Sequence, residues 1–487
     1  MIAFVAGAAT VLAFAPVGFY PLALATLALL VHLWRAAPAM RCFWTGFWFG
    51  CGFFLAGVSW VYVSLHQFGG MPSIVAALAT AGFCAFLALF PAAAGWLQAR
   101  IPASDLVRAA LLIPATWTLF EWLRGWIFTG FPWLSLGYAA TGWPLDGYAP
   151  LFGVFGLSFG TCALAGLCWH LVARKPRLVA AALVVGIVGS GAALKLVPWT
   201  TPVGEPVGVA LLQGNIRQEL KFRPERYAEI LETYARLAEE TRARLIVLPE
   251  TAIPRFYDRV EPAYLARLAS VARTNSGDVL LGVPVQAGRD VYYNSAVSLG
   301  TSPQQAYHKV HLVPFGEFIP AGFGWVLRWL QIPLSDFSRG TVAPRPLALA
   351  GQQIAVNVCY EDAFGDEIAA AAHEATLLVN VSNVAWFGDS LAPAQHLQIA
   401  QLRAIETGRM HLTATNTGIT AAIDRDGAVT GRLPQFALGR LEVAAQGYAG
   451  RTPYMRWLDW PAVLGCLALL IIAAVLARRR IGEKIPG

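Results

Sequence analysis

Long apolar runs constrain this chain more than any other feature of its sequence. They cover roughly residues 2–15, 20–34, 43–65, 73–98, 106–128, 150–173, 177–198 and 458–477. Most of them approach the ~20 residues that a helix needs to span a bilayer. Only 13% of the 487 residues are charged, whereas a soluble domain has about 25%. The sequence therefore predicts a multi-pass helical membrane domain of about eight helices.

Basic residues follow every second apolar run. They are Arg35 and Arg41, Arg100 and Arg108, Arg174, Lys175 and Arg177, and Arg478, Arg479 and Arg480. Because basic loops remain in the cytoplasm, this pattern predicts cytoplasmic termini and places residues 200–456 on the opposite side. The net charge of +7 is attributed to these basic loops, which set the orientation of the helices in the membrane. Nucleic acid is not an expected partner, since no basic patch with interleaved aromatic residues is present.

The composition changes after the seventh run. Within residues 200–456, short apolar runs such as 207–212, 245–248 and 354–358 alternate with helical stretches such as 223–241 and 394–410. Strands that alternate with helices indicate an α/β domain, whose sites form at the carboxyl ends of the strands. The predicted organisation is a membrane domain (1–199), an α/β domain (200–456), and a last helix with a basic tail (457–487).

Three segments of the α/β domain carry residues suited to catalysis. Glu250 follows a strand and lies between two prolines, on a rigid turn that suits a general base. Lys309 is one of only five lysines, against 31 arginines, and an ammonium can stabilise an oxyanion. Cys359 is the one cysteine of seven outside the apolar runs. Taken singly, each also has an ordinary interpretation: a surface Glu, a solvated Lys and a buried free Cys.

The surroundings of Cys359 predict a reactive thiol. A helix is expected to begin just after it, and both this N-terminus and Lys309 would favour the thiolate. His308 and His311 have no third metal ligand at a suitable spacing, so they are interpreted as structural or substrate-facing. No metal and no organic cofactor are expected.

The ordered set Glu250, Lys309 and Cys359 resembles the Glu–Lys–Cys triad of the nitrilase superfamily. Further segments resemble the apolipoprotein N-acyltransferase family: residues 213–216, 382–390 with Gln395 and His396, 415–418, 452–454, and the membrane segment 121–134. The resemblance covers essentially the whole chain. It implies a nitrilase-like αββα sandwich for the α/β domain.

The resemblance also implies roles for individual residues. Glu250 would be the base, Lys309 the oxyanion-stabilising cation and Cys359 the nucleophile. Supporting site residues would be Glu317, Tyr360 and Glu361, and candidates for substrate binding are Phe222, Trp325, Asn383, Trp386 and His396. Two positions depart from the family: Val384 stands where it usually has Asp, and Phe222 where it usually has Trp.

The implied reaction is the last step of bacterial lipoprotein maturation. An acyl chain would pass from a phospholipid, typically phosphatidylethanolamine, through a thioester on Cys359 to the α-amino group of the S-diacylglyceryl cysteine of a lipoprotein. The protein would lie in the inner membrane with its catalytic domain in the periplasm. The aromatic segment 318–330 is interpreted as a membrane-facing lid, with ordinary loop packing as the alternative.

Other interpretations remain open. A membrane-anchored nitrilase-like amidase would share the triad, but it does not explain seven preceding membrane helices. A transporter or lipid-binding scaffold would be expected to carry charges at the centres of its helices, which are nearly charge-free here. Glu121 and Arg124 lie three residues apart on one helix face and can pair. For this pair, a functional role and a structural ion pair are given equal weight.

Overall fold

The computed structural model describes residues 1–175, 177–319, 336–341 and 345–482, and the chain forms two compact units. The helical unit contains residues 1–62, 73–198 and the chain from Trp457 onward. The α/β unit contains residues 199–456 together with the short segment Val63–Pro72. Each unit is described separately.

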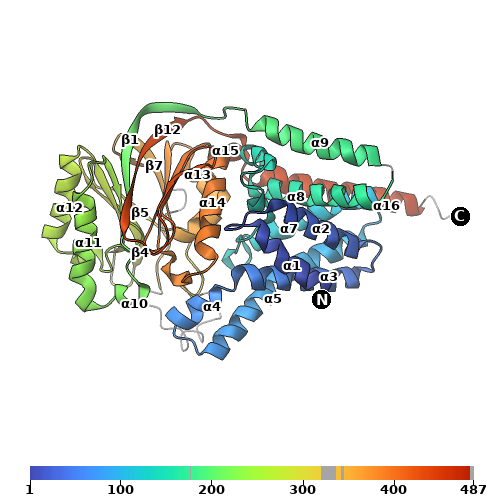
Figure 1. Ribbon diagram of the computed structural model, residues 1–487, viewed down its shortest axis with the longest axis horizontal. Helices are drawn as coiled ribbons and strands as arrows, with labels where there is room; N and C mark the ends of the chain where they lie inside the picture. The colour runs from blue at the N-terminus through green and yellow to red at the C-terminus, as the bar shows by residue number, and fades with distance from the viewer. Residues whose placement is uncertain (176, 320–335, 342–344, 483–487) are drawn as a thin grey trace. The chain divides into compact units, whose positions relative to one another are not determined.

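Apolar helices build the helical unit (Figure 1). They are α1 (Ile2–Thr10), α2 (Tyr20–Trp34), α3 (Ala39–Val58), α5 (Ser73–Arg100), α7 (Ile113–Arg124), α8 (Ala149–Ala173), α9 (Arg177–Leu194) and α16 (Trp460–Gly482). All eight predicted runs are therefore helical within the described residues. Five helices are long and apolar enough to span a membrane, or six if the bent pair Ala39–Val58 and Val61–Phe68 counts as one span. The helices at 2–13 and 20–34 are also apolar but shorter than the other candidates.

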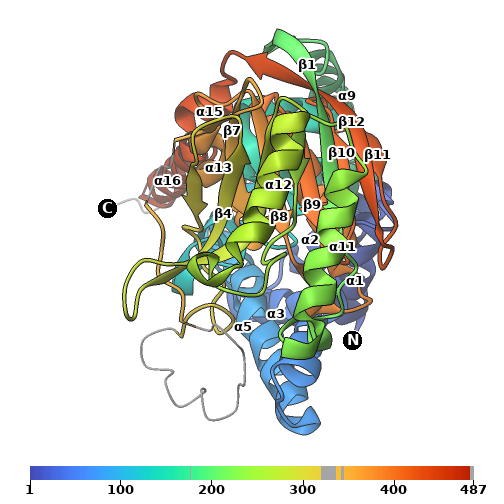
Figure 2. The same cartoon turned by 90° about the vertical axis from the view of Figure 1, so that its left-hand side faces the viewer.

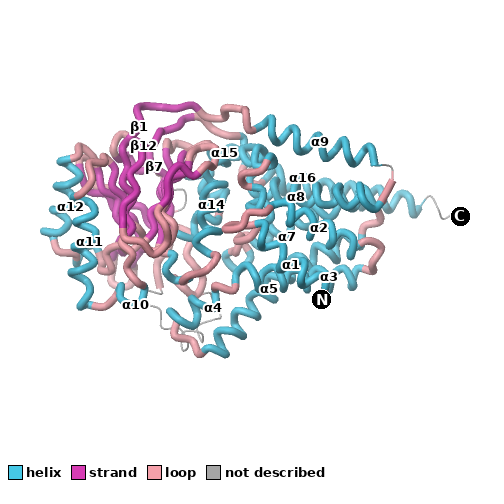
Figure 3. Tube along the Cα trace, in the orientation of Figure 1, coloured by secondary structure: helices cyan, strands magenta, loops and turns pink. Residues whose placement is uncertain are grey.

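Two six-stranded sheets form the centre of the α/β unit (Figure 3). The first has the order β12-β1-β2-β3-β4-β5 and the second the order β11-β10-β9-β8-β7-β6. The strands of the first are β12 (Gly439–Ala449), β1 (Thr201–Gln213), β2 (Leu245–Val247), β3 (Asp278–Gln286), β4 (Tyr292–Gly300) and β5 (Ala306–His308). Those of the second are β11 (Val429–Arg432), β10 (Ala421–Ile423), β9 (Met410–Thr415), β8 (Leu377–Ser382), β7 (Gln352–Val358) and β6 (Leu347–Leu349).

Alternation along the strands explains the layers. On β1, Val209 and Leu211 join the core between the two sheets, whereas Ala210 and Leu212 join a second core under the helices. This period of two is the strand's own geometry, because successive side chains point to opposite faces. Helices α11 (Tyr227–Glu239) and α12 (Pro262–Thr274) run side by side over the first sheet (Figure 2). Helices α13 (Gly365–Ala371) and α14 (Ala392–Thr407) cover the second. The predicted αββα sandwich is confirmed.

Parallel strands bring the candidate residues to one edge of each sheet. In the first sheet β1, β2 and β3 are parallel, and in the second β7, β8 and β9 are parallel. Glu250 follows β2, Cys359 follows β7 and Asn383 follows β8. The apolar runs 207–212, 245–248 and 354–358 correspond to β1, β2 and β7, as the sequence predicted.

Candidate active site

Glu250 is held on a tight turn beyond β2. The next residue, Thr251, has a φ of +48°, so the chain reverses sharply there. One carboxylate oxygen, Oε1, accepts a hydrogen bond of 2.7 Å from the Asn294 side chain, and the other accepts one of 2.8 Å from the backbone N–H of Asn383. Glu250 is thus a buried carboxylate whose two oxygens are oriented by donors from β4 and from the end of β8.

Lys309 follows β5 and is 1% exposed. Its ammonium donates to Glu317 at 2.9 Å and lies 3.8 Å from the Glu250 carboxylate. Burial alone would lower the pKa of Lys309, but the carboxylates of Glu317 and Glu250 outweigh it and hold that pKa above its ordinary value. Lys309 therefore carries a positive charge at the site throughout the physiological pH range.

Cys359 lies directly after β7, where the chain turns. It has a φ of +54°, an unusual backbone conformation for a residue other than glycine. Cys359 is the first residue of a short 3-10 helix, Cys359–Ala363, which precedes α13. The thiol is buried and interacts electrostatically with both Glu250 and Lys309. The predicted triad residues therefore converge, although they come from three separate segments.

The expectation of a stabilised thiolate at Cys359 is not met in this structure. Burial raises the pKa of the Cys359 thiol to about 12, and the negative charge of Glu250 raises it further than Lys309 lowers it. The 3-10 turn after Cys359 has only five residues, so little helix dipole acts on the sulfur. The Cys359 thiol is therefore neutral at physiological pH, and a base would have to accept its proton before the sulfur could act as a nucleophile.

Glu361 joins the Lys309 segment to the Cys359 segment. Its Oε1 accepts the backbone N–H groups of Val310 and His311, and its Oε2 accepts the Tyr307 hydroxyl and the N–H of Val358. Burial raises the pKa of Glu361 to about 7, against the opposing effect of Lys309. Glu361, predicted as a supporting residue, thus links the segment that carries Lys309 to the segment that carries Cys359.

A buried cluster fixes the backbone behind the nucleophile. The Cys359 carbonyl oxygen accepts a hydrogen bond from Asn380 at 3.1 Å and lies 3.2 Å from His396 Nε2. The carboxylate of Asp362 contacts His396 at 3.3 Å and His411 at 3.0 Å. His396, a predicted substrate-binding candidate, therefore contacts the nucleophile's own backbone.

The other predicted residues have separate positions. Tyr360 is buried with its ring edge against Phe364. Asn383 donates from its side chain to Gln218, so its polar groups face protein partners. Trp386 is half-buried, and its carbonyl accepts a hydrogen bond of 2.7 Å from Ser64. Phe222 ends the short helix α10 (Gln218–Lys221) and is half-buried.

Some predictions lie outside the described residues or have a simple packing explanation. Trp325 and most of the proposed lid 318–330 fall in the stretch 320–335, which is not described. Val384 is buried, and a side-chain atom added at Gly418 would meet its methyl group. An apolar residue at this position therefore suits its surroundings. His311 stacks on Phe364, and His308 stacks on Tyr293.

Two polar residues of the site were missed by sequence reasoning. Asn294 Nδ2 donates to both Glu250 and Glu317 at 2.7 Å. Lys221 is 1% exposed and donates to the Glu250 carbonyl oxygen at 3.1 Å. The rarity of lysine that pointed to Lys309 applies equally to Lys221, so a signal existed for it. In the described part of the chain, no three His, Cys, Asp or Glu side chains converge as metal ligands.

The buried charges of the helical unit have structural partners. Arg124 donates to the carbonyl oxygens of Phe131 and Trp133, and Glu121 accepts from Trp117 and from the N–H of Leu136. The two side chains brace the turn after α7, which accounts for their burial without a substrate.

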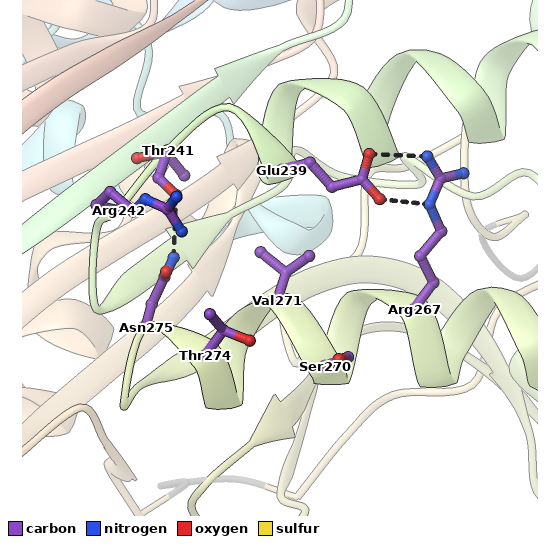
Figure 4. Close-up of a pocket in the computed structure, with 8 residues that line it drawn as sticks. All are labelled: Glu239, Thr241, Arg242, Arg267, Ser270, Val271, Thr274 and Asn275. Atoms are coloured by element: carbon purple, nitrogen blue, oxygen red, sulfur yellow. Dashed lines mark hydrogen bonds and ion pairs between the residues drawn. The ribbon is translucent and has the colours of Figure 1, made fainter.

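A surface hollow of about 260 Å³ lies apart from these residues (Figure 4). Its lining residues lie on and directly after α11 and α12, and Arg267 forms an ion pair with Glu239 there. None of the predicted site residues lines it. Its exposed ion pairs resemble an ordinary solvated surface.

Two family models and a solved structure match parts of this chain. Residues 6–167 match the family described as apolipoprotein N-acyltransferase N-terminal domain, and residues 208–454 match carbon-nitrogen hydrolase. A mutant of the Nesterenkonia AN1 amidase, from the nitrilase superfamily, is a solved structure with 22% identity and a TM-score of 0.37; the match covers 52% of this chain and 95% of that one.

Relatives align along nearly the whole chain. The apolipoprotein N-acyltransferase of Nitrosomonas europaea is 50% identical over 98% of this chain and 96% of its own length. That of Methylococcus capsulatus is 46% identical over 96% of this chain and 94% of its own length. Since both the apolar N-terminal part and the triad-bearing part are included in these matches, the chain belongs to the apolipoprotein N-acyltransferase family.

Proposed function

We propose that Cys359 carries the acyl group during lipoprotein N-acylation, with Glu250 as the base and Lys309 as the stabilising cation. The observation that carries the proposal is the convergence of the Glu250 and Lys309 charges on the buried Cys359 thiol. Full-length relatives named apolipoprotein N-acyltransferase favour this function over the amidase alternative.

In the first half-reaction, Glu250 takes the proton of the Cys359 thiol as the sulfur attacks the ester carbonyl of a phospholipid. A proton acceptor is needed because the resting thiol is neutral. Lys309 stabilises the negative oxygen of the tetrahedral intermediate. The ester C–O bond then breaks, Glu250 returns the proton to the leaving alkoxide, and a lysophospholipid departs.

In the second half-reaction, the α-amino group of the diacylated lipoprotein attacks the thioester. Glu250 takes a proton from the attacking nitrogen and returns it to the sulfur as the C–S bond breaks. The products are an amide and the free thiol, so the enzyme is restored. Acyl transfer from an ester to an amine suits this route, because the thioester divides it into two easier steps.

Phosphatidylethanolamine is proposed as the donor, and the inner membrane as the location, with residues 200–456 on the periplasmic side. The basic residues that follow every second apolar run support this orientation. A phospholipid ester and a lipoprotein amine both lie near the headgroup level of a bilayer. An extracytoplasmic α/β domain on membrane helices suits both substrates.

Intact-mass measurement tests the covalent step. The purified protein is incubated with phosphatidylethanolamine beside Cys359→Ala and the control Cys168→Ala, which changes a half-buried cysteine of the helical unit. Wild type and control should gain one acyl mass that a diacylated lipopeptide removes, and Cys359→Ala should gain none. N-acylated lipopeptide formed by Cys359→Ala at the wild-type rate would refute the thioester route.

A further inference from the structure

Lys221 is a buried charged group for which the proposed reaction has no role. The chain has five lysines, and only Lys221 and Lys309 occur in residues 200–456. Both are 1% exposed, whereas lysine is almost never fully buried without a partner. A buried ammonium costs free energy unless nearby negative groups compensate it.

The contacts of Lys221 lead to the catalytic base. Among the described residues, its Nζ donates one hydrogen bond, to the backbone oxygen of Glu250 at 3.1 Å. Its charge interacts with the Glu250 carboxylate and with the Cys359 thiol. Burial lowers the pKa of Lys221 to about 8, while those two groups oppose the decrease.

The other end of α10 reaches Glu250 by a second path. Gln218 accepts a hydrogen bond of 2.9 Å from the Asn383 side chain, and the Asn383 backbone N–H donates to Glu250 Oε2. One short element thus contacts the backbone of the base directly and its carboxylate through Asn383. Because α10 has only four residues, its helix dipole is negligible. Its influence on Glu250 therefore comes from the side chains of Lys221 and Gln218.

The charges of the site explain the need for a second cation. Glu250, Glu317 and Glu361 all interact with Lys309, the single cation of the triad. Transfer of the Cys359 proton to Glu250 moves one negative charge onto the sulfur, and the negative groups of this buried site still outnumber Lys309. A second ammonium next to Glu250 reduces this excess, since charges interact strongly where the effective dielectric constant is low.

We propose that Lys221 is a positioning residue of the acyl transfer: it fixes the backbone of Glu250 and supplies the second positive charge that stabilises Cys359 as it loses its proton. The proposal rests on the proposed function in its use of Cys359 as nucleophile. It assigns Lys221 no direct contact with substrate.

Three variants separate charge from structure. Lys221→Met removes the charge and the donor, and Lys221→Gln removes the charge but keeps an N–H donor. Arg223→Met is the matched control, because it removes an exposed cation two residues away. Two readouts are compared: the rate of Cys359 alkylation by iodoacetamide between pH 6 and pH 10, followed on the Cys359 peptide by mass spectrometry, and acyl-enzyme formation from phosphatidylethanolamine.

The charged and titratable groups around Cys359 are Glu250, Tyr307, Lys309, Glu317, Glu361, Asp362, His396 and His411. Because all of them remain in every variant, a difference between profiles reports the loss of the Lys221 charge. Alkylation at pH 7 should be about tenfold slower in both Lys221 variants, corresponding to one unit in the thiol pKa. Arg223→Met should match wild type.

Acyl-enzyme formation should also slow in both Lys221 variants at saturating phospholipid, with the half-saturating concentration unchanged. Alkylation profiles of both variants that overlay wild type would overturn the proposal. Failure of both to fold, as judged by thermal unfolding, would also overturn it, because Lys221 would then be purely structural. Alkylation needs no lipid, so a failure of the thioester route appears separately, as acyl transfer that persists in Cys359→Ala.

Discussion

At the scale of single residues, the charge of Glu250 has two opposing effects on Cys359. It raises the pKa of the thiol, and so keeps the sulfur protonated in the resting site. The same carboxylate is the proposed acceptor of that proton. A neutral thiol is a poor nucleophile and is slow to oxidise, so we expect Cys359 to react slowly without a base that accepts its proton.

Glu250→Gln separates the two effects. Removing the negative charge should lower the pKa of the Cys359 thiol, because Lys309 then acts with less opposition. Alkylation of Cys359 by iodoacetamide at pH 8 should therefore be faster than in wild type, while acyl-enzyme formation is lost. Glu205→Gln, an exposed change on β1, should alter neither rate. Slower alkylation in Glu250→Gln would contradict the assigned electrostatics.

At the scale of elements, the turn after β7 owes its shape to groups behind it. Cys359 adopts a positive φ, a conformation that persists only where the surroundings impose it. Asn380 on β8 and His396 on α14 hold its carbonyl oxygen, and Asp362 is held in turn by Asn357, His396 and His411. The backbone of Cys359 is thus held by groups on neighbouring strands and on a covering helix.

Asp362→Asn should weaken this support. His411 and His396 hold the pKa of Asp362 below its ordinary 3.8 although burial opposes them. Since the folded pKa is lowered, the stabilisation is present above about pH 3.8 and is lost as the pH falls below it. Loss of the hydrogen bonds that this buried carboxylate accepts costs about 1–3 kcal/mol.

Thermal unfolding of wild type and Asp362→Asn should therefore differ equally at pH 7 and pH 5, and less at pH 3. The matched control is Asp389→Asn, which changes an exposed carboxylate after β8 and should unfold like wild type at all three values. A difference that grows as the pH falls would show that Asp362 is not the stabilising partner.

Close packing of helices is a second property at this scale. A Cβ at Gly52 of α3 would lie 1.9 Å from the backbone oxygen of Phe4, and one at Gly7 of α1 would lie 1.9 Å from that of Phe49. Small residues let helices approach closely where apolar surroundings provide little driving force for association.

Gly52→Val should therefore destabilise the helical unit, because backbone atoms cannot move aside as a flexible side chain can. Gly82→Val is the control, since a Cβ at that position on α5 meets no atom within 4 Å. Unfolding of the detergent-solubilised protein should begin at a clearly lower temperature in Gly52→Val alone. Equal loss in both variants would indicate a general intolerance of valine in these helices instead.

At the scale of the whole molecule, the apolar helices and the basic residues between them bear on how the protein is oriented in a membrane. The apolar helices favour a membrane, and the clusters of basic residues favour one side of it. A catalytic domain on the opposite side would meet lipoproteins after their export. This orientation is a proposal that accessibility can test.

Two serine-to-cysteine changes provide that test. Ser270 is exposed on α12 of the α/β unit, and Ser104 is exposed just before the helical segment Asp105–Val107. A maleimide that cannot cross the inner membrane should label Ser270→Cys in intact spheroplasts, and Ser104→Cys only after lysis. Labelling of Ser104→Cys alone in intact spheroplasts would reverse the proposed topology.

The sequence by itself determined the features that have local signals. Apolar runs predicted the helices. Glu250 was recognisable on its turn between two prolines, Lys309 by the rarity of lysine, and Cys359 as the cysteine outside the apolar runs. The lengths of the first two helices were not evident from the sequence, because an apolar run of 9–15 residues resembles a longer one until its helix ends are known.

Only the tertiary structure decided how the site is supported. Asn294 and Asn383 contact Glu250 from positions 44 and 133 residues away, so no local pattern records the pairing. The state of the thiol was also a tertiary property: burial raised the pKa that the neighbouring residues alone were expected to lower. Hydrogen bonds and desolvation depend on distances in space, whereas hydrophobic period and strand ends are written along the chain.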